Sequence, residues 1–109
     1  MPELIRRGDV YWVEASPVTG SEQWGLRPAV ILSNDIGNAY APIVEVAFLT
    51  REKRWMPTHV KVKAVQKSIA LCEQITTISK ARLVSFIKSA TPEEMEEIDK
   101  AVKISLGLN

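Results

Sequence analysis

The order of local patterns along the chain constrains its fold more than any other feature of the sequence. Over the first 90 of 109 residues, short apolar and β-branched runs are separated by Gly, Pro, Asn and Asp. Such runs predict strands, and the residues between them predict turns. No helical pattern lies between the strand patterns, and parallel strands would need such crossover helices. The chain should therefore form a small antiparallel sheet.

One long connection interrupts these strands. The loop over residues 16–26 is long for a compact domain, and long connections often carry function. The continuous apolar run within residues 28–33 predicts burial on both faces or in a barrel interior, and residues 34–42 read as a turn region. The predicted strands are residues 10–13, 28–33, 43–50, 59–65 and 68–75, with a further short strand at 83–87 after a turn at 79–82.

Alternation within two strands predicts which side chains share a face. Residues 59–65 alternate between apolar and polar side chains, as in a half-exposed antiparallel strand. At the end of strand 43–50, Thr50 has the parity of Val46 and Phe48.

The last segment is predicted to be a helix. Thr91 is an N-cap, Pro92 suits the first helical position, and Glu94 completes a capping box. Gly107 is the expected stop. The predicted packed face comprises Met95, Ile98, Val102 and Leu106. We therefore expect a mainly β fold with a C-terminal α-helix, a bent sheet or partial barrel, in a single domain over residues 1–109.

Composition excludes several classes of function. Cys72 is the single cysteine, so no intrachain disulfide forms, and its apolar neighbours favour a buried side chain over a nucleophile. With one His and one Cys at no ligand spacing, no metal site or cofactor is expected. We interpret His59 as structural. Neither a membrane span nor the apolar segment of a signal peptide is present, which predicts a cytoplasmic protein with no membrane partner.

Charge is divided unevenly along the chain. Residues 1–90 carry twelve Lys and Arg against eight Asp and Glu, whereas residues 91–109 carry two against five. A mildly basic body attracts polyanions, although a mixed, solvated surface gives the same balance. The acidic end is explained by the helix dipole, which favours carboxylates in the first turns.

A candidate anion site lies in residues 20–38, where a polar loop is followed by Arg27-Pro28 and an apolar run. Pro28 biases Arg27 towards extended backbone, and the apolar run anchors that geometry in a core. A fixed cation beside a polar loop suits a phosphate or a carboxylate. An ordinary loop before a strand has the same pattern.

Several short segments carry a resemblance that runs in order along nearly the whole chain. They are Arg7-Gly8-Asp9-Val10-Tyr11, Ser16-Pro17, Gly20-Ser21-Glu22-Gln23, Gly25-Leu26-Arg27-Pro28, Asn34-Asp35, Pro57-Thr58-His59-Val60, Glu73-Gln74-Ile75 and Ile104-Ser105-Leu106-Gly107-Leu108. Together they closely resemble the MazF/PemK family of toxin endoribonucleases, in particular the Gram-positive-like MazF proteins.

The resemblance implies a homodimer with an SH3-like β-barrel of the MazF/PemK/CcdB type and a C-terminal helix. It implies the toxin of a type II toxin–antitoxin system, inhibited by a cognate MazE-like antitoxin. The implied activity is sequence-specific, metal-independent cleavage of single-stranded mRNA, leaving 2′,3′-cyclic phosphate and 5′-hydroxyl ends, with no DNA required for catalysis.

The resemblance also implies roles for individual residues. The catalytic pair is expected to be Arg27 and Thr50. Arginine can meet two phosphate oxygens with a permanent charge, and threonine can donate a neutral hydrogen bond. Two features depart from close relatives. Trp24 stands where glycine is usual, and it either stacks on a base or packs within the protein or its dimer contact. Residues 51–55, which include Arg54, set basic side chains beside an aromatic, as a stacking and phosphate platform or as a solvated hairpin tip. The expected RNA-binding residues are Ser21, Glu22, Gln23, Trp24, Asn38, Arg54 and Gln74.

Two other functions remain open at the level of sequence. A gyrase poison of the CcdB type would share the fold, but that family ends in Trp-Gly-Ile, and this chain ends Leu106-Gly107-Leu108-Asn109. A catalytically silent SH3-like binding module would retain Arg27 and Thr50 in a blocked site.

Overall fold

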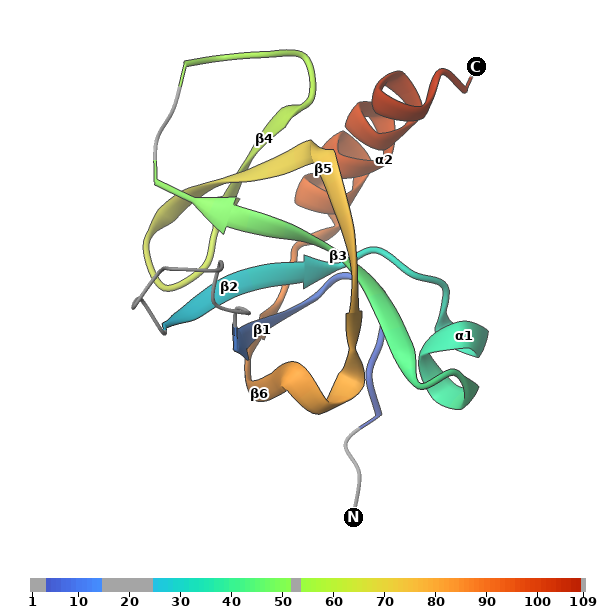
Figure 1. The fold of residues 1–109 in the computed structure, drawn as a ribbon. Coiled ribbons are helices and arrows are strands. Elements are labelled where there is room, and N and C mark those ends of the chain that lie inside the picture. The colour runs from blue at the N-terminus through green and yellow to red at the C-terminus, as the bar shows by residue number, and fades with distance from the viewer. Residues whose placement is uncertain (1–3, 15–24, 52–53, 109) are drawn as a thin grey trace, which may run out of the picture.

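The computed structural model describes residues 4–14, 25–51 and 54–108. Within them the chain forms six strands, one long helix, one short helix and a 3-10 turn, as Figure 1 shows. The elements are β1 (Asp9–Glu14), β2 (Leu26–Ile31), α1 (Asp35–Tyr40), β3 (Ile43–Thr50), β4 (His59–Lys63), β5 (Lys67–Ser79), η1 (Lys80–Arg82), β6 (Leu83–Ser89) and α2 (Pro92–Leu106). None of the helices described is long and apolar enough to cross a membrane.

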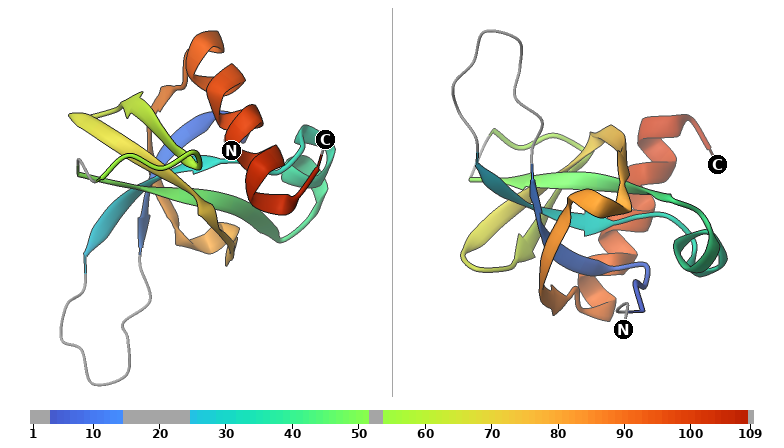
Figure 2. Two further views of the ribbon diagram at one scale, coloured as in Figure 1. Left: turned by 90° about the horizontal axis from the view of Figure 1, so that it is seen from above. Right: turned by 60° about the horizontal axis from the view of Figure 1, so that its bottom comes forward.

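All strand pairs in the described sheet are antiparallel, in the spatial order β4-β5-β3-β2-β1-β6. The sheet curls, and α2 packs along one side of it (Figure 2). The predicted fold class, a mainly β SH3-like barrel with a C-terminal helix, is confirmed.

The two faces of the sheet each have an apolar cluster. We call the side beneath α2 the helix face; there Val30, Leu49 and Cys72 pack with Ile98 of the helix. The other side, the second face, carries Ala29, Val46 and Ile78, with Phe48 partly buried beside them. Because side chains alternate along each strand, the same strands supply both clusters.

Strand predictions agree with the structure except near the ends. Residues 43–50 form β3 as predicted, and the run in β2 is buried on both faces, since Ala29, Val30 and Ile31 are each 0% exposed. β2 begins at Leu26, so Arg27 is a strand residue. β5 extends to Ser79, beyond the predicted end at 75, because its second half pairs with the start of β3.

Residues 34–42 are not a simple turn as predicted. They contain the helix α1, which begins after Asn34, whose side chain accepts a hydrogen bond from the Gly37 backbone N–H. This is an N-cap, and with Asp35 in the first turn it could have been recognised in the sequence.

Helix α2 begins as predicted. The Thr91 side chain accepts from the Glu94 backbone N–H, the Glu94 carboxylate accepts from that of Thr91, and Gly107 ends the helix in the left-handed region. The predicted packed face was wrong at Leu106, which is 56% exposed, whereas Ala101 is buried. In Figure 1 the C-terminal end of α2 extends away from the sheet.

Candidate functional site

Arg27 and Thr50 come from neighbouring antiparallel strands. The last aligned pair at this end of β2 and β3 is Ala29 with Phe48. Continuing that register by two residues sets Arg27 opposite Thr50, on the second face. The sheet therefore brings together two residues that lie 23 positions apart in the sequence.

An aromatic ring supports the arginine side chain. The Arg27 guanidinium carbon lies 4.7 Å from the centre of the Phe48 ring, a cation–π arrangement. Arg27 remains exposed and Thr50 is partly exposed. A ring that packs one side of the guanidinium plane leaves its N–H edge available, which is the geometry for bidentate contact with a phosphate.

Gln74 lies at the point where the pairing of β3 and β5 shifts. Ala47 pairs with Ile75, and continuing that register by one residue sets Phe48 opposite Gln74; the next pair is Leu49 with Ala70. Residues 71–73 of β5 are therefore extra residues that form a bulge beside Gln74. Bulges redirect side chains and are common next to functional sites. Gln74 is exposed there, next in sequence to Ile75.

Three polar side chains fix the bulge. Glu73 accepts hydrogen bonds from the Thr58 hydroxyl at 2.9 Å and from Nε2 of His59 at 2.9 Å. The Nδ1 atom of His59 lies 2.9 Å from the carbonyl oxygen of Arg54. Both ring nitrogens of His59 are therefore engaged by neighbouring groups. This geometry favours the structural interpretation of His59 over a role as base.

The hydrogen bonds of this cluster lower the pKa of the Glu73 carboxyl. Partial burial pushes the pKa of Glu73 up, but hydrogen bonds from His59, from the backbone and from Thr58 bring that pKa below its ordinary value. The sequence analysis named Thr58 and Glu73 only as parts of two separate motifs and gave neither a role. Their hydrogen bond joins Thr58, which is 8% exposed, to a residue 15 positions away, so no local pattern shows it.

The predicted RNA contact of Asn38 does not fit its position in the structure. Asn38 is 1% exposed in α1, and its side-chain amide donates to the Ser33 carbonyl while its side-chain oxygen accepts from the Ser33 hydroxyl. Both polar groups are used internally, so the residue braces the connection between β2 and α1. We leave Asn38 out of the proposed RNA contacts.

Cys72 is a buried thiol on the helix face. Desolvation by burial, with a smaller effect from the Glu73 charge, raises the pKa of Cys72 to about 11. The thiolate is the nucleophilic form, so this group is unreactive near neutral pH. Among the residues described, no group of three or more His, Cys, Asp or Glu side chains is placed to hold a metal ion.

Five predicted RNA-binding residues remain, and the structure describes one of them, Arg54. Ser21, Glu22, Gln23 and Trp24 lie outside the described residues. Arg54 is exposed, and Trp55 beside it is 74% exposed.

Comparison with known proteins identifies the family. Residues 6–106 match the family described as the PemK-like, MazF-like toxin of type II toxin–antitoxin systems. The chain belongs to this family. The match spans all the described strands and α2, so the whole sheet and its helix are family features.

Solved structures of the family have the same fold. An endoribonuclease from a mycobacterial species is 26% identical with a TM-score of 0.82, over 97% of this chain and 94% of that chain. A structure of the same description in complex with its cognate antitoxin is 27% identical with a TM-score of 0.82, over 96% of this chain and 97% of that chain. MazF in the MazE–MazF complex of Deinococcus radiodurans has a TM-score of 0.85 at 21% identity, over 99% of this chain and 100% of that chain.

Proposed function

We propose that this MazF-type toxin is a sequence-specific endoribonuclease that cleaves single-stranded mRNA without a metal ion, leaving 2′,3′-cyclic phosphate and 5′-hydroxyl ends. The observation that supports the proposal is the register of β2 with β3, which, continued by two residues, sets exposed Arg27 opposite partly exposed Thr50. Mycobacterial structures at 26–27% identity that are described as endoribonucleases support the same activity.

In the proposed reaction the ribose 2′-oxygen attacks the adjacent phosphorus. A 2′-O–P bond forms, the P–O5′ bond breaks, the 2′-hydroxyl loses its proton and the leaving 5′-oxygen gains one. Negative charge builds on the phosphate oxygens during this step. The Arg27 guanidinium stabilises that charge, and the Thr50 hydroxyl donates a second hydrogen bond to the same centre. Aligning the 2′-oxygen, phosphorus and 5′-oxygen supplies further rate.

Neither Arg27 nor His59 is suited to accept the proton of the ribose 2′-hydroxyl. Arginine keeps its proton in proteins, and both ring nitrogens of His59 are engaged by neighbouring groups. The carboxylate of Glu22, in the segment that precedes β2, has suitable chemistry for the base. We propose Ser21, Gln23, Trp24, Arg54 and Gln74 as further RNA contacts, with Gln74 held by the β5 bulge.

The proposal includes two protein partners and a place of action. The D. radiodurans and mycobacterial structures described as complexes with an antitoxin support a MazE-like antitoxin for this chain. We further propose that the toxin acts as a homodimer in the cytoplasm, where mRNA is found. Light scattering of the purified protein measures its mass against 12.2 kDa for one chain.

The test is incubation of the purified protein with a long single-stranded RNA in EDTA, followed by mapping of the cut ends. We expect cuts at a recurring short sequence, with 5′ ends that a polynucleotide kinase labels directly because they carry hydroxyls. A single-stranded DNA of the same sequence should stay intact, since it lacks the 2′-hydroxyl. Intact RNA, or cleavage that requires added Mg²⁺, would overturn the proposal and leave a silent binding module in its place.

A further inference from the structure

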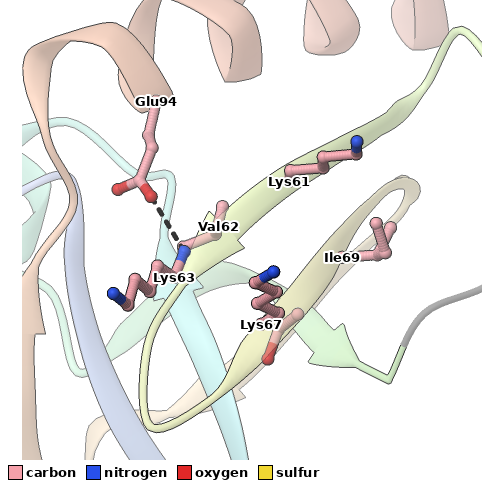
Figure 3. Close-up of a pocket in the computed structure, with 7 residues that line it drawn as sticks. Lys61, Val62, Lys63, Lys67, Ile69 and Glu94 are labelled. Atoms are coloured by element: carbon pink, nitrogen blue, oxygen red, sulfur yellow. Dashed lines mark hydrogen bonds between the residues drawn. The ribbon is translucent and has the colours of Figure 1, made fainter.

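Three lysines surround a cavity of about 420 Å³ beside the β4–β5 hairpin (Figure 3). Lys61 and Lys63 belong to β4 and Lys67 begins β5. All three are exposed, and Ile69 and Glu94 also line the cavity. In the sequence, Lys61 and Lys63 belong to the polar half of the alternating strand 59–65, and Lys67 lies between that strand and the next.

The three lysines share the face of the sheet that carries the proposed catalytic pair, whereas Val62 and Glu94 line the cavity from the helix face. Thr50 pairs with Ile69, and Ile69 pairs with Lys61, so these three side chains form one row across β3, β5 and β4. Arg27 extends the same row on β2 in the continued register. Adjacent strands lie about 4.8 Å apart, so the row from Arg27 to Lys61 follows a contour of roughly 14 Å. Lys63 and Lys67 form the next rung along the strands on the same face.

The charges of this hairpin work against its stability. Lys63 pairs directly with Lys67, and like charges opposite each other on neighbouring strands are destabilising. In the part of the chain that the structure describes, none of the three ammonium groups forms an ion pair. The three lysines therefore concentrate positive charge that no carboxylate of the described residues pairs with, and such a surface attracts polyanions. The repulsion between Lys63 and Lys67 is the cost in stability.

The one carboxylate at the cavity has other partners. Glu94 accepts hydrogen bonds from the backbone N–H of Lys63 at 2.8 Å and of Thr91 at 2.8 Å, and it lies 3.7 Å from Nζ of Lys88. Partial burial raises the pKa of Glu94, but these hydrogen bonds and the Lys88 charge bring that pKa below its ordinary value. Glu94 therefore neutralises Lys88 and holds the end of β4, and leaves the three lysines available for a ligand.

We propose that Lys61, Lys63 and Lys67 form a distal phosphate-binding subsite for the RNA strand that enters or leaves the Arg27–Thr50 centre. The inference rests on the proposed ribonuclease function. Continuity of the row favours RNA over an acidic peptide, because a single strand repeats its phosphates along the path that the cations follow. Ile69, between Thr50 and Lys61, is 7% exposed and places no negative charge between the two. Small β-barrel modules of comparable size bind roughly 4–16 nucleotides along such grooves.

The experiment compares a double variant, Lys63→Gln with Lys67→Gln, with a control that removes the same charge elsewhere, Lys100→Gln with Lys103→Gln on the exposed side of α2. Cleavage of a long single-stranded RNA and of a minimal RNA spanning only the mapped cut site is measured at several salt concentrations. A thermal melt checks the fold of each variant. The hairpin variant should melt at or above the wild-type temperature, because the Lys63–Lys67 repulsion is gone.

We expect the hairpin variant to raise KM for the long RNA by about tenfold or more at low salt, and to leave kcat unchanged. The slope of log affinity against log salt should fall by about 1.4, at roughly 0.7 for each phosphate that the protein no longer neutralises. Cleavage of the minimal RNA should be the same for the wild type and both double variants. The control should match the wild type on the long RNA.

Other outcomes overturn the inference in distinguishable ways. If the wild type cleaves RNA and the hairpin variant matches the control on long RNA, the subsite is wrong and the proposed function stands. If only binding of an acidic polyglutamate peptide is lost, the cavity serves a peptide and not RNA. If the wild type neither binds nor cleaves RNA, both proposals fail together.

Discussion

The helix face and the second face of the sheet differ in what surrounds their side chains, although the same strands build both. On the helix face, Val30, Leu49 and Ile98 pack into a closed apolar cluster under α2. On the second face, the apolar cluster gives way at one end of β2 and β3 to exposed Arg27 and partly exposed Thr50. No helix of the described chain covers that end (Figure 2). Strand alternation therefore places the residues of the stable core and those of the proposed chemistry on opposite faces, so each set can be altered alone.

The Arg27→Ala variant should show the largest effect, a loss of activity with little change in stability. It removes the charge that stabilises the phosphate oxygens, so kcat for RNA cleavage should fall on the order of 10²–10³-fold or more. Because the side chain is exposed and makes one ring contact, the free energy of unfolding should change by no more than about 1 kcal/mol. Single-turnover cleavage and urea denaturation measure the two effects, and unchanged kcat would remove Arg27 from its role.

The converse is expected for Ile98→Ala on the helix face. Ile98 is 0% exposed, so its truncation leaves a cavity between α2 and the sheet and should lower the free energy of unfolding by about 2–5 kcal/mol. At a temperature where the variant stays folded, kcat should be that of the wild type. A large loss of kcat with intact folding would show that the two faces are coupled.

A smaller effect on stability alone is expected for Thr91→Ala. This change removes the N-cap of α2 and half of its capping box, at a cost of about 1 kcal/mol. Thr91→Ser keeps the hydroxyl and should restore most of the loss in a denaturant titration. A loss equal for alanine and serine would contradict the capping role.

The smallest expected effect is a change in the acid stability of the bulge beside Gln74 when Glu73 is replaced. The pKa of Glu73 in the folded state lies below its ordinary value of 4.5. Its ionised form therefore adds stability that is present above the unfolded pKa and is lost as pH falls through the folded pKa. Glu73→Gln should flatten the stability profile below about pH 4.5, whereas Glu93→Gln, in the first turn of α2, serves as a matched charge control. Identical acid profiles for Glu73→Gln and the wild type would argue against the cluster.

Local patterns were sufficient for most elements and for the residue types at the site. Strand 43–50 and the capping box at Thr91 could be predicted because alternation and capping both depend on residues that are close together in the sequence. The short helix α1 was missed because six residues give too little periodicity to outweigh Gly37 and Asn38. Leu106 was misplaced because helical spacing shows which side of α2 is apolar and not where the sheet beneath it ends.

The arrangement of the site depended on pairing that no local pattern contains. Arg27 and Thr50 were singled out separately, but their juxtaposition follows from the register of β2 with β3. Gln74 falls opposite Phe48 in the continued register of β3 with β5, just before that register shifts. The row from Thr50 to Lys61 crosses three strands, so its continuity also becomes visible only in the sheet.

The most direct measurement uses an RNA whose cut nucleotide, once mapped, is replaced by its 2′-deoxy counterpart. Wild-type protein in EDTA should cleave the unmodified RNA and leave the modified RNA intact at that position, because attack by the 2′-oxygen is the bond-forming step at the Arg27–Thr50 centre. Arg27→Ala should leave both RNAs intact. Equal cleavage of the two RNAs by the wild type would contradict the mechanism, since no 2′-hydroxyl would then take part.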